Sequence, residues 1–101
     1  MSLPKLVRDK IPGIIRDSGK ELRGHVADSS ELNILLIRKM EEELAEFSET
    51  PCLDEAADIY EVFLAILKNW KLSLSDVRNT AALKKEIRGS FEHGIVLDEI
   101  L

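Results

Sequence analysis

Two stretches of this chain, 28–48 and 50–70, carry apolar residues at helical spacing, and each includes two acids three positions apart on an apolar side. The acids are Glu43 with Glu46 and Glu55 with Asp58. Residues three apart lie on one helix face, one turn apart. The apolar pattern predicts that these faces point inward, so four carboxylates meet inside a small helical protein. Buried carboxylates take up protons, pair with cations or bind metal.

The first of the two helices is predicted to begin after Asp28, which forms a capping pair with Glu31, and to end near Ser48. Glu43 falls in the middle of its main apolar stripe, and Glu41 is expected on the solvent side. The stripe consists of Leu32, Leu35, Leu36, Met40 and Phe47. A second apolar strip consists of Ile34, Ile37 and Leu44.

The next helix is predicted to run to about Trp70, with Thr50 as its cap and Pro51 as its first residue. It is apolar around most of its circumference, and Glu55 and Asp58 lie within one apolar face. A helix of this kind is buried from several sides. Because so short a chain has few elements to cover it, we expect a homodimer or higher homo-oligomer.

Two further helices complete the expected fold, one over 11–17 and one beginning at Ser73 or Ser75 and ending near Gly89. The run 95–97 is a candidate strand partner for 25–27. The sequence thus predicts a single all-α domain over 1–101, a compact four-helix fold with this short two-stranded pairing as an option and with helices packing across a dimer.

Composition excludes several classes of protein. A formal net charge of −5 argues against nucleic acid as the main partner. No apolar run approaches the roughly 20 residues that span a bilayer, and charges in the first ten residues argue against export. A single Cys52 rules out an intramolecular disulfide and suits a reducing cytoplasm.

The four acids also have a simpler interpretation. Acidic clusters usually cover a solvated helix face, Lys39 is placed to pair with Glu43 at i,i+4, and Glu55 lies in a first turn that favours acids. Glu43 within an apolar stripe favours a metal site instead. Oxygen ligands suit Mg²⁺ or Mn²⁺ better than Zn²⁺. No Glu-x-x-His pair is present, which disfavours a di-iron site.

The order of the motifs resembles a known family. Residues 39–46 read KMEEELAE and residues 54–62 read DEAADIYEV, an arrangement similar to the MazG-like all-α NTP pyrophosphatase superfamily. The opening KLVRDKIP at 5–12 and RGSFE at 88–92 look like its small phosphoribosyl-ATP pyrophosphohydrolase-like branch. One departure is the separation of Glu46 from Glu55 by only eight residues, fewer than in most of the superfamily.

The resemblance implies a Mg²⁺-dependent enzyme, with Mn²⁺ as an alternative ion, that hydrolyses the bond between the α- and β-phosphates of a nucleoside triphosphate or phosphoribosyl-ATP-like substrate. Its metal ligands would be Glu43, Glu46, Glu55 and Asp58. Glu42 or Glu43 would activate water, an alternative that the sequence leaves open. Arg8, Lys10, Lys39 and Arg88 are candidates for binding substrate phosphates.

A second hypothesis belongs to another class. The chain would be a non-catalytic helical dimerisation module whose acidic cluster is structural or vestigial. An enzyme binds Mg²⁺ and releases pyrophosphate, whereas such a module does neither.

Overall fold

The computed structural model describes residues 4–101 and contains four α-helices. Their bounds are α1, Ile11–Asp17, α2, Ser29–Glu49, α3, Leu53–Asn69, and α4, Leu74–Arg88. Residues 4–101 contain no strand, so the optional pairing of 25–27 with 95–97 is wrong. Three-residue runs offer too few ladder hydrogen bonds to hold a pair of strands together without further packing. The all-α class is confirmed.

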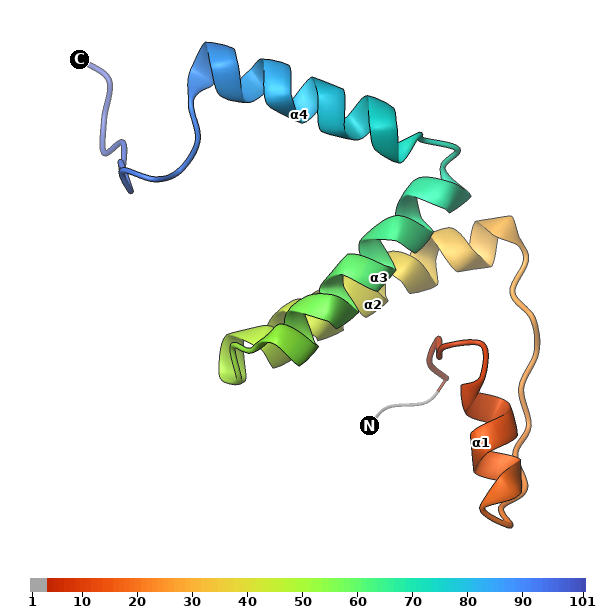
Figure 1. The fold of residues 1–101 in the computed structure, drawn as a ribbon. Coiled ribbons are helices and arrows are strands. Elements are labelled where there is room, and N and C mark those ends of the chain that lie inside the picture. The colour runs from red at the N-terminus through yellow and green to blue at the C-terminus, as the bar shows by residue number, and fades with distance from the viewer. Residues whose placement is uncertain (1–3) are drawn as a thin grey trace. The chain divides into compact units, whose positions relative to one another are not determined.

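The chain divides into two units, Met1–Lys71 and Leu72–Leu101. In the first unit, α2 and α3 pack along each other as an antiparallel hairpin (Figure 1). Leu36 on α2 and Val62 and Leu67 on α3 form its apolar core, at 3%, 9% and 6% exposed. The Asn69 side chain donates to the backbone oxygen of Ser29 at 3.4 Å and bonds the side chain of Asn33, tying the end of α3 to the start of α2.

The start of α2 follows the prediction, because the Asp28 side chain accepts from the backbone N–H of Glu31 at 2.9 Å. The predicted start of α3 is wrong. Thr50 closes α2, with its backbone N–H on the Glu46 oxygen at 3.0 Å, and Cys52 occupies the N-cap of α3. Pro51 has no N–H to extend α2, and it disfavours helical geometry at Thr50, so the chain stays extended for one more residue before α3 begins.

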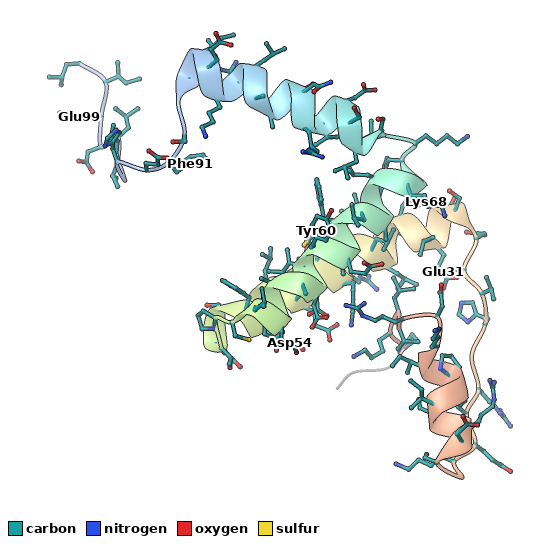
Figure 2. The ribbon with its side chains drawn as sticks, viewed as in Figure 1. Glu31, Asp54, Tyr60, Lys68, Phe91 and Glu99 are labelled. Carbon is teal, nitrogen blue, oxygen red and sulfur yellow. The ribbon has the colours of Figure 1, made fainter. Side chains whose placement is uncertain are left out.

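In the second unit, Ser73 caps α4 by accepting from the Asp76 N–H at 3.3 Å, and Gly89 ends it with a φ of 84°. That left-handed region favours glycine, as expected for a helix stop. No residue of α4 is buried, and Phe91 in the tail is 99% exposed (Figure 2). None of the described helices is long and apolar enough to cross a membrane.

Candidate metal centre

The α2–α3 hairpin brings the four predicted acids together. Glu43 and Glu46 from α2, and Glu55 and Asp58 from α3, each offer one carboxylate oxygen such that all four atoms lie within 4.8 Å of one another. We call these four residues the acidic cluster. The i,i+3 spacing places each pair on one face, and the antiparallel packing opposes the two faces. Local spacing and one helix–helix contact therefore suffice to build it. The expectation that all four acids lie inside is wrong, because only Glu43 is buried, whereas Glu55 and Asp58 are half-buried and Glu46 is exposed.

The spacing of these oxygens suits a divalent cation. At the Mg²⁺–oxygen distance of roughly 2.1 Å, ligands on opposite sides of the ion stand about 4.2 Å apart. The four oxygens, held within 4.8 Å of one another, lie close to that spacing.

Glu43 is the most deeply buried member of the acidic cluster. Glu43 is only 5% exposed, and its Oε2 is buried without a hydrogen-bond partner among the described residues. Glu55 Oε2 is in the same condition. Buried polar atoms are normally paired, because leaving one unsatisfied costs about 1–3 kcal/mol and more for a charged group. The residues present thus fit a divalent metal ion.

The pKa of Glu43 is raised above its ordinary value of 4.5. Desolvation by burial is the main cause, and the negative charges of Glu46 and Asp58 act in the same direction. Lys39 opposes both, with its Nζ 3.3 Å from Glu43 Oε1. One lysine therefore does not compensate for the burial of this carboxylate beside two other acids.

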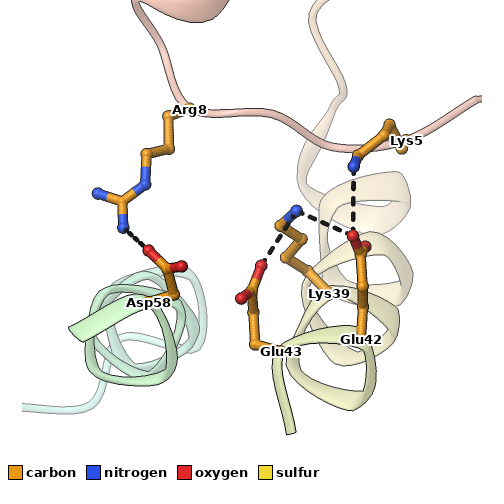
Figure 3. A network of polar contacts seen from close by, with 6 residues as sticks. All are labelled: Lys5, Arg8, Lys39, Glu42, Glu43 and Asp58. Carbon is orange, nitrogen blue, oxygen red and sulfur yellow. Dashed lines mark hydrogen bonds and ion pairs between the residues drawn. The ribbon is translucent and has the colours of Figure 1, made fainter. Parts of the chain in front are cut away.

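Glu42 has a different environment from its neighbour. Its Oε1 lies 3.2 Å from Lys5 Nζ and 3.5 Å from Lys39 Nζ (Figure 3). Burial alone would raise the pKa of Glu42, but the hydrogen bond from Lys5 and the charge of Lys39 outweigh it, and the pKa falls below 4.5. Glu42 is thus ionised and paired, and it lies outside the acidic cluster.

The four candidate phosphate-binding residues have distinct positions. Arg8 Nη2 lies 2.7 Å from Asp58 Oδ1. Lys39 pairs with both Glu42 and Glu43. Arg8 and Lys39 therefore both contact the carboxylates. Lys10 is the exposed N-cap residue of α1, and Arg88 ends α4 in the second unit. Within residues 4–101, neither Lys10 nor Arg88 makes an ion pair.

The sequence did not predict a role for Lys5, although its side chain is only 12% exposed and pairs with Glu42. The partners are 37 positions apart, so no local pattern announces the contact. The available signal was the position of Lys5 at the start of the KLVRDKIP run, three residues before Arg8.

Comparison with known proteins adds no assignment to this geometry. No family model matches the chain, no curated protein matches it, and no solved structure matches it.

Proposed function

We propose that this protein is a Mg²⁺-dependent nucleotide pyrophosphohydrolase of the MazG-like kind. It would cleave the α–β phosphate bond of a nucleoside triphosphate or a phosphoribosyl-ATP-like substrate, giving a monophosphate and pyrophosphate. The observation that carries the proposal is the buried Oε2 of Glu43, which has no hydrogen-bond partner within residues 4–101, in a cluster of four carboxylates. A purely structural acidic cluster gains nothing from leaving that atom unsatisfied.

The acidic cluster would hold the metal ion through Glu43, Glu46, Glu55 and Asp58. Bound there, Mg²⁺, or Mn²⁺ in its place, supplies positive charge to the phosphate oxygens and lowers the pKa of a bound water. The same burial that makes Glu43 costly in the metal-free protein makes it a strong ligand.

Glu42 is the better candidate to orient the attacking water. It follows from the geometry that Glu42 adjoins the cluster without belonging to it, and both of its lysine pairs use Oε1. Its Oε2 is thereby left to accept a hydrogen bond from water. The lowered pKa keeps this carboxylate ionised at neutral pH, as a proton acceptor requires.

Cationic side chains would neutralise the substrate phosphates. Arg8 and Lys39 already lie among the carboxylates, and Lys10 and Arg88 are further candidates in the proposal. An arginine fork matches phosphate geometry. We assign the protein to the cytoplasm as part of the proposal, since nucleotide substrates and a lone exposed cysteine fit a reducing compartment.

One observation favours the second candidate, the dimerisation module. The apolar strip of α2 remains uncovered, with Ile34, Ile37 and Leu44 at 57%, 46% and 51% exposed. A surface of this kind suits association of two copies whether or not the protein is an enzyme.

A nucleotide panel with separate detection of pyrophosphate and orthophosphate tests the proposal. We expect Mg²⁺-dependent pyrophosphate release from at least one nucleotide and loss of nearly all activity in Glu43→Gln. Glu41→Gln is the matched control, because Glu41 is an exposed acid on the same helix, outside the cluster. Orthophosphate as the primary product refutes the assigned bond. No turnover with either Mg²⁺ or Mn²⁺ favours the dimerisation module.

A further inference from the structure

The segment before α1 lies across the side of the α2–α3 hairpin that carries the acidic cluster, and it contacts both helices. Lys5 pairs with Glu42 of α2 at 3.2 Å, and Arg8 pairs with Asp58 of α3 at 2.7 Å. Figure 3 shows the two side chains reaching from this segment toward opposite helices, with Glu43 between them. Residues 5–8 thus form a cationic strap over the acidic cluster.

The two ends of the strap differ in exposure. The Lys5 side chain is 12% exposed, and its partner Glu42 lies outside the acidic cluster. The Arg8 side chain is 56% exposed, and its partner Asp58 is a member of the cluster. Lys5 therefore anchors the segment, whereas Arg8 is free to exchange with solvent and sits on a carboxylate that a metal ion would use.

The charges around the hairpin allow such an exchange. When ionised, Glu42 and the acidic cluster present five negative charges, and Lys5, Arg8 and Lys39 bring three positive ones. Two negative charges remain. A divalent cation neutralises both, so the acidic cluster no longer needs Arg8 for its charge balance, and the guanidinium is available to pair with an incoming phosphate.

We propose that Arg8 is an exchangeable counter-ion, which holds Asp58 in the metal-free protein and leaves it for a substrate phosphate when a divalent cation occupies the acidic cluster. This inference rests on the metal site of the proposed function. Arg8 and a cation on the same carboxylate carry like charges several ångströms apart. At that distance salt screens their repulsion only in part. Because Lys5 still holds the segment to Glu42, the displaced Arg8 guanidinium stays near the site. Cation binding therefore frees Arg8 to bind an anion.

The direct test is Mn²⁺ binding to the full chain, followed through the electron paramagnetic resonance signal of the free ion. If Arg8 competes with the cation, Arg8→Gln binds Mn²⁺ more tightly, by roughly fivefold, as expected for removing one nearby positive charge. Arg8→Lys keeps the charge and stays close to the wild type. Arg16→Gln, an exposed arginine on α1, controls for the change in net charge.

The outcomes separate the two ideas. Wild-type protein that binds no Mn²⁺ refutes the metal site, and with it both proposals. Wild-type binding with unchanged or weaker binding in Arg8→Gln overturns the exchange alone, because Arg8 then positions Asp58 instead of competing for it.

A second readout follows the strap itself. Trypsin cleavage of the Arg8–Asp9 bond is expected to accelerate when Mn²⁺ saturates the protein, because Arg8 leaves its ion pair. Cleavage after Arg23, an exposed loop residue, measures the protease under the same conditions. Equal rates at the Arg8 bond with and without Mn²⁺ contradict the displacement.

Discussion

Lys39 Nζ lies 3.3 Å from Glu43 Oε1, yet Glu43 Oε2 stays buried without a partner in the described part of the chain. The lysine is itself mostly buried, with 17% of its side chain exposed, and it divides its charge between Glu43 and Glu42. These contacts therefore compensate the ionised form of Glu43 only in part. Glu42 and Glu43 are neighbours on one helix, yet their pKa values are shifted in opposite directions, lowered for Glu42 and raised for Glu43.

Glu43→Gln is expected to raise the melting temperature of the metal-free protein at neutral pH. The folded-state pKa of Glu43 is raised, so its contribution to stability is fully present below about 4.5 and is lost as pH rises through the folded-state value. Glutamine at position 43 carries no charge, so the variant does not lose this stability as pH rises. Thermal melts in EDTA between pH 4 and 8 measure it, with Glu41→Gln as control. A lower melting temperature for Glu43→Gln at pH 7 would show that the Lys39 pair dominates.

Glu42→Gln is expected to have the opposite effect. The folded-state pKa of Glu42 is lowered, so its contribution to stability is present above 4.5 and disappears as pH falls through the folded-state value. The variant should melt below the wild type at pH 7 and converge with it in acid. The same melts test this, and a difference that does not depend on pH would rule out the ion pairs with Lys5 and Lys39 as its cause.

Mg²⁺ is expected to raise the melting temperature of the wild type and to leave Glu43→Gln/Asp58→Asn unchanged. A ligand that binds only the folded state at 100 times its Kd adds about 2.7 kcal/mol to the free energy of unfolding. The gain should grow with pH, because the raised pKa of Glu43 makes a proton compete with the metal. Equal insensitivity of both proteins to Mg²⁺ and Mn²⁺ would contradict the site.

Sequence patterns predicted the parts of this structure that depend on local spacing. The bounds of α1 and α2 follow from helical period and capping residues such as Asp28, and the acidic cluster follows from two i,i+3 pairs on apolar faces. Glu43 is buried because its position within the stripe leaves it no route to solvent.

Contacts between distant positions could not be predicted in this way. Arg8 and Asp58 are 50 residues apart, and nothing in either local sequence specifies the partner. The start of α3 was misplaced because Thr50 and Pro51 also satisfy the rules for ending α2, and the competition was decided by the extra backbone bond from Thr50 to Glu46.

Leu36→Ala is expected to reduce the free energy of unfolding by about 2–4 kcal/mol. Leu36 is 3% exposed in the core between α2 and α3, so truncation loses the burial of its side chain and leaves a cavity. Ile34→Ala, two residues earlier and 57% exposed, is the matched control and should cost well under half as much. Urea denaturation of both variants measures the difference, and equal losses would place the packed face of α2 elsewhere.

The uncovered apolar strip of α2 leads to the last prediction, that the chain forms a dimer or larger assembly at micromolar concentration. Ile37 lies within this strip at 46% exposed, and a stable interface needs roughly 800 Å² from each partner. Ile37→Glu places a charge that would have to be desolvated, so it should shift the assembly toward monomer in sedimentation velocity. Ile14→Glu, at an exposed isoleucine of α1, should leave the distribution unchanged. A wild-type protein that sediments as a monomer at 100 µM would contradict the prediction and leave the strip as ordinary exposed surface.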